Sequence, residues 1–179
     1  FIAELHRSKT SHYMEILADG GIPLRTGVRR LIEEVREHGL RLAIATTTTP
    51  INVSTLLKYS LAPDSEAWFD VIAAGDVVAN KKPAADIYQY TLDRLSIDAE
   101  QCIAFEDSAN GVRSSLGAGI TTIVTVNDYT KDEDVNSASL VVDHFGEPDQ
   151  PFQVLAGNAQ GECYVDMALI QEIWNQGNQ

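Results

Sequence analysis

The sequence predicts an α/β fold built on a parallel, doubly wound sheet. Short apolar segments that fit buried strands alternate along the chain with amphipathic segments that fit helices. This alternation is typical of strand–helix–strand units, in which helices cover both faces of a parallel sheet. Such sheets bind ligands beyond the carboxyl ends of their strands. The polar residues that follow the apolar segments are therefore the first candidates for a functional site.

The first quarter of the chain predicts two helices and then a strand. Residues 3–18 have helical character, and a glycine- and proline-containing segment at 20–23 ends it. Residues 27–38 predict an amphipathic helix with one apolar face, and Gly39 is well placed to end it. Residues 40–45 then predict a short buried strand.

The rest of the chain continues the alternation and then becomes irregular. Further strands are expected at 69–73, 102–105, 120–126 and 140–142. Further helices are expected at 51–59, 84–95 and 109–117. Residues 144–162 are rich in glycine and proline and predict loops.

Length and composition suit one core domain with room for a small appendage. The chain has 179 residues, of which 44% are hydrophobic. It opens with Phe1 and shows no signal-peptide pattern, so we expect a fragment or a processed product. No apolar run reaches the roughly 18 residues that a membrane helix needs, so we expect no membrane partner.

The charge balance bears on which classes of partner and substrate the chain can bind. The 26 acidic residues outnumber the 13 basic ones, the net charge is −13, and no basic stripe is present, so no nucleic-acid partner is expected. An acidic field repels anionic substrates at long range, so a bound phosphate must be held by local cations. Cys102 and Cys163 are too few for a disulfide framework and lack metal-ligand spacing, which fits a reduced cytoplasmic compartment.

Four threonines follow the strand predicted at 40–45. The hydroxyls of Thr46 to Thr49 could cap the next helix, and the segment taken alone favours that interpretation. Alternatively, a hydroxyl and the neighbouring backbone N–H groups could grip a phosphate at the start of the helix.

A lysine and an acidic pair complete the pattern. Lys82 lies in a loop, where a lysine is usually a solvated charge. Glu106 and Asp107 follow another apolar strand, and adjacent carboxylates repel each other unless a cation or hydrogen-bond donors offset the repulsion. They could bind a metal, or Asp107 or Ser108 could cap the following helix. Together, a hydroxyl, a lysine and paired carboxylates are what phosphoryl chemistry on magnesium requires.

At these positions the chain resembles the haloacid dehalogenase-like hydrolase superfamily. Its second motif ends an apolar strand in Thr or Ser and is matched at Thr46. Its third motif is matched at Lys82-Pro83, and its acidic fourth motif at Glu106-Asp107. Longer segments resemble, more narrowly, the CbbY-type subfamily, and they lie at 5–10, 44–53, 74–78 and 141–148.

The resemblance implies a Rossmann-like core and a magnesium-dependent phosphatase of phosphorylated sugars. Residues 1–20 would be the C-terminal remnant of a helical cap, and residues 21–179 would be the core. Some xylulose-bisphosphate phosphatases share the CbbY features, so a small bisphosphorylated sugar such as xylulose-1,5-bisphosphate is an expected substrate. An aspartate attacks phosphorus in this family, and water then hydrolyses the aspartyl-phosphate.

The resemblance also assigns roles to individual residues. Thr46 and Lys82 would be catalytic and would bind the phosphate, with the backbone of Thr47 as a further phosphate contact. Asp107 would ligate Mg²⁺, and Glu106 would ligate it or hold its water. Lys9 matches a cap lysine that contacts substrate in the related beta-phosphoglucomutases; taken alone, it is an ordinary surface lysine of a helix.

The main departure from the family pattern is the absence of its first motif, Asp-x-Asp. In the family that motif supplies the nucleophile, on a strand between the strands that end here at Thr46 and Glu106. The later acidic run at 132–134 fits a solvated loop instead. We therefore expect two unpaired strand edges, no turnover by this chain alone, and a homodimer or a rearranged sheet if it folds alone. A beta-phosphoglucomutase-type mutase, an inactive phosphate- and metal-binding module and a truncated fragment stay open as alternatives.

Overall fold

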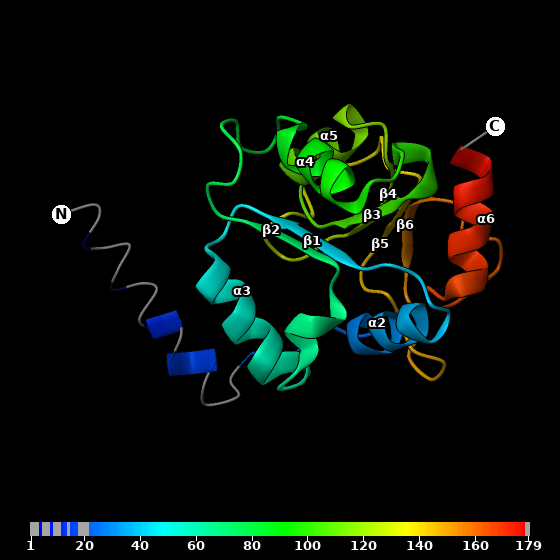
Figure 1. The fold of residues 1–179 in the computed structure, drawn as a ribbon. Coiled ribbons are helices and arrows are strands. Elements are labelled where there is room, and N and C mark those ends of the chain that lie inside the picture. The colour runs from blue at the N-terminus through cyan, green and yellow to red at the C-terminus, as the bar shows by residue number, and fades with distance from the viewer. Residues whose placement is uncertain (1–3, 5–7, 9–11, 14, 18–21, 178–179) are drawn as a thin grey trace.

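The computed structural model describes residues 4, 8, 12–13, 15–17 and 22–177, and Figure 1 shows helices on both sides of the strands. The helix predicted at 3–18 lies largely outside the described residues, as does the boundary proposed between 1–20 and 21–179. From residue 22 onward the alternation of strands and helices follows the prediction, with the ends of most elements shifted by one to three residues.

The strands are short, and the helices between them are two to three turns long. The six strands of the described chain are β1 Ala43–Thr46, β2 Val71–Ala74, β3 Ile103–Glu106, β4 Thr121–Thr125, β5 Leu140–Val142 and β6 Val154–Gly157. From residue 22 onward, the α-helices are α2 Val28–Glu37, α3 Pro50–Leu56, α4 Asp86–Leu95, α5 Ala109–Gly117 and α6 Met167–Gly177. A π-helical turn at Leu57–Leu61 continues α3, and short 3₁₀ turns lie at Ser65–Trp68 and Ala99–Gln101.

The strands form two separate sheets. One pairs β1 with β2, and the other has the order β3-β4-β5-β6. All pairs are parallel except β5 with β6, which is antiparallel. The expectation of an irregular segment at 144–162 is therefore wrong at β6. The expected unpaired edges are confirmed, because within the described chain β1 and β3 each end a sheet and do not pair with each other.

The core of the larger sheet shows that it is doubly wound. Ile123 on β4 packs into a cluster with residues of α2 and α6, including Leu31 and Ile173. The next residue, Val124, packs with Val112 of α5 on the opposite face. Successive side chains of a strand point to opposite faces, so β4 is buried between two helical layers.

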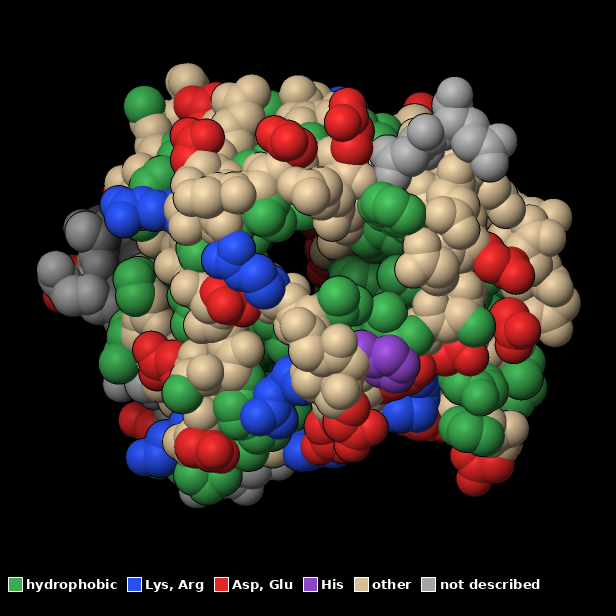
Figure 2. All heavy atoms as spheres, turned by 45° about the vertical axis from the view of Figure 1, so that its right-hand side comes forward, with side chains coloured by type: hydrophobic (Ala, Val, Ile, Leu, Met, Phe, Trp, Pro, Cys, Tyr) green, Lys and Arg blue, Asp and Glu red, His purple; other side chains and the backbone are tan. Residues whose placement is uncertain are grey.

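Helix α4 joins the two sheets. Its buried residues Ile87 and Tyr88 pack in one cluster with Ala73 of β2 and Ala104 of β3. On the other face Phe105 of β3 is 37% exposed, although it lies in the middle of a strand and packs edge-on against Phe145. Figure 2 shows a deep opening with apolar side chains around it. Among the described strands, β3 has a partner on one side only.

No helix in the described part of the chain is both long and apolar enough to cross a membrane.

Candidate active site

The predicted site residues lie at the carboxyl ends of β1 and β3. Thr46 is the last residue of β1 and Glu106 is the last residue of β3. Lys82 comes from the loop between β2 and α4, and its Nζ donates to the carbonyl of Ala45 at 3.0 Å. The same Nζ lies 2.6 Å from Oε1 of Glu106. The lysine thus spans the space between the two sheets and shows that both strands end at the same edge.

The lysine and the glutamate form a largely buried ion pair. Their side chains are 16% and 6% exposed. A buried charge needs a partner and hydrogen bonds to offset its lost hydration. An ammonium has three donors, and its hydrogen bonds to the described residues use two of them, which leaves one donor for a ligand.

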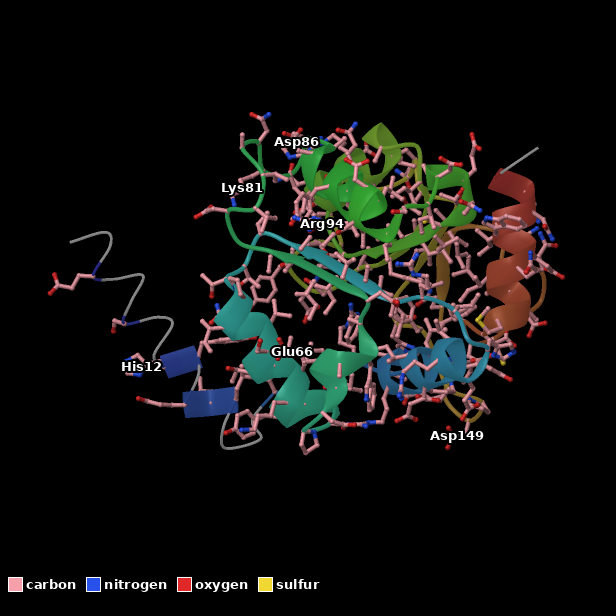
Figure 3. The ribbon with its side chains drawn as sticks, viewed as in Figure 1. His12, Glu66, Lys81, Asp86, Arg94 and Asp149 are labelled. Atoms are coloured by element: carbon pink, nitrogen blue, oxygen red, sulfur yellow. The ribbon has the colours of Figure 1, made fainter. Side chains whose placement is uncertain are left out.

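The loop that carries Lys82 is tied down on both sides. Lys81 pairs with Asp76 at 2.6 Å, and this contact lowers the pKa of the Asp76 carboxyl. Figure 3 shows Lys81 on this loop, near Asp86 at the start of α4. The hydroxyl of Ser114 on α5 donates to the carbonyl of Ala84 at 2.6 Å. The position of the lysine is therefore set by α4 and α5 rather than by an isolated loop.

Glu106 is held in one orientation. Its Oε1 accepts the hydroxyl of Tyr88 as well as the ammonium of Lys82. On its other side a Cβ added to Gly111 would lie 1.8 Å from Oε2. Only glycine leaves room for this carboxylate, which explains why a glycine follows Ser108 at the third position of the turn that begins α5.

Asp107 differs from its neighbour in being exposed. The surrounding protein removes part of the hydration of its carboxylate and so raises the pKa of Asp107, and the charge of Glu106 raises it further. Lys82 and Arg25 oppose that rise only in part. An ionised carboxylate in such surroundings is stabilised by an added cation.

The alternative of helix capping is settled for this segment by Ser108. Its Oγ accepts the backbone N–H of Gly111 at 3.2 Å and makes Ser108 the N-cap of α5. The capping role therefore falls to the serine, and the Asp107 carboxylate is not needed for it.

The threonines do not cap α3 through their side chains. Thr49 holds the N-cap position without a side-chain cap bond, and Pro50 begins the helix. Thr46 Oγ1 accepts the backbone N–H of Thr48 at 3.3 Å, which folds the segment back over the end of β1. Thr47 is exposed at this turn. The turn places a hydroxyl and exposed backbone beside the Lys82 contact to Ala45.

The residues present fit a magnesium ion held by few protein ligands. No group of three or more His, Cys, Asp or Glu suited to a metal occurs within the described residues. Magnesium keeps several waters and often uses one or two carboxylates together with substrate phosphate. The exposed Asp107 suits that role, whereas Oε1 of Glu106 is engaged by Lys82 and Tyr88.

Two residues at this edge, Tyr88 and Arg25, have contacts that the sequence did not predict. Tyr88 lies in the helix predicted at 84–95, and helical periodicity does not reveal the contact that its hydroxyl makes with Glu106. Arg25 donates to Thr125, to the carbonyl of Val126 at 2.7 Å and to the carbonyl of Asp143, and no sequence signal pointed to it. Lys9 lies outside the described residues.

Comparison with known proteins gives the family. The family model for haloacid dehalogenase-like hydrolases matches residues 3–125. The chain is 42% identical over 177 residues to the plasmid-encoded protein CbbY of Cupriavidus necator, covering 98% of this chain and 68% of that protein. It is 44% identical over 146 residues to protein CbbY of Cereibacter sphaeroides, covering 82% of this chain and 64% of that protein.

A solved structure agrees with these relatives. The crystal structure of a mutant of CbbY from Rhodobacter sphaeroides, in complex with xylulose-(1,5)bisphosphate, matches with a TM-score of 0.76 and 43% identity. The match covers 80% of this chain and 64% of that one. The chain thus spans about two thirds of the length of these CbbY proteins. On its sequence and its fold, the chain belongs to the haloacid dehalogenase-like hydrolase family.

Proposed function

We propose that this chain supplies the phosphate- and metal-binding part of a magnesium-dependent phosphatase of phosphorylated sugars. The observation that carries the proposal is the bridge made by Lys82 between the ends of β1 and β3, beside the exposed Asp107. Phosphoryl transfer depends mainly on positioning and on offsetting the charge of the phosphoryl oxygens. A largely buried lysine with a donor to spare, next to an available carboxylate, suits that task.

Each residue then has a separate part. Lys82 donates to a phosphoryl oxygen, while the hydroxyl of Thr46 and the backbone at Thr47 hold the other oxygens. Asp107 holds Mg²⁺, which when bound offsets negative charge on the phosphate. Glu106 holds Lys82 in place, and this role fits its contacts better than direct ligation of the metal.

The attacking aspartate would come from a strand placed between β1 and β3. In the family, this position carries the Asp-x-Asp motif, and the two facing edges are unpaired among the described strands. A strand there would bring its carboxyl end next to Lys82. This chain alone should therefore bind phosphate without turning it over.

The substrate class rests on similarity to CbbY. The Rhodobacter sphaeroides protein was crystallised with xylulose-(1,5)bisphosphate, so a sugar bisphosphate is the first candidate here. The two cysteines are free thiols, which suits the cytoplasm, where small phosphorylated sugars are found.

Calorimetric titration tests the proposal directly. Inorganic phosphate is titrated into the chain with and without Mg²⁺, and we expect measurable binding that weakens at least tenfold in Lys82→Met. Xylulose-1,5-bisphosphate should compete with phosphate, whereas unphosphorylated xylulose should not. Lys58→Met removes a lysine from the π-helical turn after α3 and is the matched control. The proposal is wrong if phosphate does not bind, or if Lys82→Met binds it as well as the control does.

A further inference from the structure

We propose that Tyr88 is a positioning residue, which fixes Lys82 and Glu106 in the arrangement that receives the phosphate. The inference rests on the proposed function and adds to it a residue on α4 that no motif of the sequence marks. Tyr88 acts through its neighbours, since its hydroxyl donates to Glu106 and its ring lies against the ammonium of Lys82.

The first observation is the hydrogen bond of the tyrosine hydroxyl. Tyr88 is 8% exposed, and its hydroxyl donates to Oε1 of Glu106. A buried tyrosine hydroxyl needs a partner, and here the partner is the carboxylate that also holds Lys82. One oxygen thus receives two donors, which restricts rotation of the carboxylate and offsets part of its charge.

The second observation is the place of the ring. Lys82 Nζ lies 5.0 Å from the centroid of the Tyr88 ring, within the range of a cation–π contact. The ammonium is therefore held by the ring, the Ala45 carbonyl and Glu106 together. These contacts leave few directions for its remaining N–H group.

The third observation is the rigidity of the platform. Tyr88 lies on α4, whose buried face packs on both sheets through Ile87, Ala73 and Ala104. The buried phenol of Tyr88 donates to the Glu106 carboxylate, which fixes the direction of its O–H group. Gly111 closes the other side of Glu106. The carboxylate is thus confined between a helix on each side.

Loss of the hydroxyl has a predictable effect. Without it, Glu106 can rotate and draw Lys82 away from its position, and more of the carboxylate charge faces an incoming anion. Both changes weaken phosphate binding. The effect should vanish when Lys82 is already absent, because Tyr88 acts through it.

Three variants test this inference in the full chain. Tyr88→Phe keeps the ring and removes the hydroxyl, Tyr88→Leu removes both, and Tyr90→Phe changes a half-buried tyrosine on the same helix as the control. Inorganic phosphate is titrated with Mg²⁺ present. We expect about tenfold weaker binding in Tyr88→Phe and no change in Tyr90→Phe. In the Lys82→Met background, Tyr88→Phe should not weaken phosphate binding any further.

A second readout does not depend on phosphate. The rate at which a small acylating reagent modifies Lys82 is followed by mass spectrometry of peptides. Tyr88→Leu uncovers the ammonium and should raise this rate several-fold, whereas Tyr90→Phe should not change it. Equal Lys82 rates in wild type and Tyr88→Leu would overturn the placement of the lysine by the ring, whether or not phosphate binds.

The outcomes separate the two proposals. Absence of phosphate binding in the wild-type chain refutes the proposed function, while the acylation rates still decide the role of Tyr88. Unchanged phosphate affinity in Tyr88→Phe, with only a lower melting temperature, shows a purely structural residue and refutes the inference.

Discussion

Asp107 lies at the proposed metal site, and its ionised carboxylate lowers the free energy of unfolding. Its pKa is raised because partial burial removes water from the carboxylate and because the charge of Glu106 repels it. The folded state therefore binds this proton more tightly than the unfolded state does, and the free energy of unfolding falls as pH rises from the ordinary value of 3.8 through the raised value. Above that window the destabilisation is fully present.

Asp107→Asn should therefore stabilise the fold at neutral pH while removing the proposed metal ligand. We expect a higher urea midpoint than wild type at pH 8, and a difference that shrinks as the pH falls through the raised pKa toward the ordinary carboxyl value of 3.8. Calorimetry should show that Mg²⁺ binding is lost. A lower midpoint at pH 8 would mean that Lys82 and Arg25 outweigh the burial and the repulsion by Glu106.

Gly111 and Gly117 lie on the same helix, and their replacement by alanine should have different effects on the free energy of unfolding. A Cβ at Gly111 would meet Glu106 Oε2 at 1.8 Å, and this carboxylate cannot move without breaking its contacts to Lys82 and Tyr88. We expect Gly111→Ala to lower the unfolding free energy by about 1–3 kcal/mol. At Gly117 the nearest atom is Ala85 Cβ at 3.4 Å, an ordinary contact.

Gly117→Ala should be neutral or stabilising, by up to about 1 kcal/mol, because alanine favours the helix. Chemical denaturation of both variants makes the comparison. Equal effects at the two positions would show that Glu106 is not confined as described. Weakened phosphate binding in Gly111→Ala alone would tie the glycine to the site as well as to stability.

At the level of single elements, the N-terminus of α5 has a carboxylate that the sequence did not reveal. Glu133 Oε2 accepts the backbone N–H of Ala109 at 2.6 Å. The acidic run at 132–134 is an exposed loop, as predicted, and Glu133 makes this contact from within it. A carboxylate at a helix N-terminus satisfies a free donor and interacts favourably with the helix dipole.

Glu133→Ala should destabilise the chain by about 0.5–2 kcal/mol, the usual range for loss of a helix cap. Asp132→Ala, one residue away in the same loop, is the control and should have little effect. Thermal melts at low and high salt measure both variants. Added salt should reduce the difference between Glu133→Ala and wild type, since screening weakens the charge contribution. A difference that does not respond to salt would assign the loss to the hydrogen bond alone.

The elements that the sequence predicted correctly are those with buried patterns. Helix α2 and strand β5 match their predicted ranges closely, since an apolar helical face or a fully buried strand is visible in the sequence. Strand β6 was missed because its Val154 and Leu155 are 40% and 48% exposed at the edge of the sheet. A short exposed strand in a glycine-rich segment has no periodicity to detect.

The candidate site was predictable to the extent that strand ends determine it. Thr46 and Glu106 could be placed at one edge because parallel strands end together. Tyr88 and Arg25 could not, because their contacts join residues far apart in the sequence. The distance from Tyr88 to Glu106 is 18 positions, and that from Arg25 to Thr125 is 100.

Across the whole molecule, one arginine joins the start and the end of the core. Arg30 on α2 contacts Glu147 at 3.0 Å and Glu34 at 3.0 Å, and it donates to the carbonyls of Gly146 and Val165. The other oxygen of Glu147 accepts the N–H of Gly27. The CbbY-like segment at 141–148 therefore helps to attach the C-terminal part of the core to α2.

The split of the sheet leads to the last prediction. Strand β4 has a partner on each side, whereas β1 and β3 each have a partner on one side among the described strands. Backbone amides without a hydrogen-bond partner exchange readily with solvent. In hydrogen-exchange mass spectrometry of the chain alone, peptides covering β1 should exchange faster than those covering β4.

The exposed apolar Phe105 and the two open edges also favour self-association, so light scattering should give a mass above that of the monomer. We expect the same sample not to hydrolyse p-nitrophenyl phosphate with Mg²⁺, because the Asp-x-Asp motif that supplies the attacking aspartate in the family does not precede β1 in this sequence. A protected β1 in a monomer with turnover would mean that the chain's own residues fill the space and supply the nucleophile.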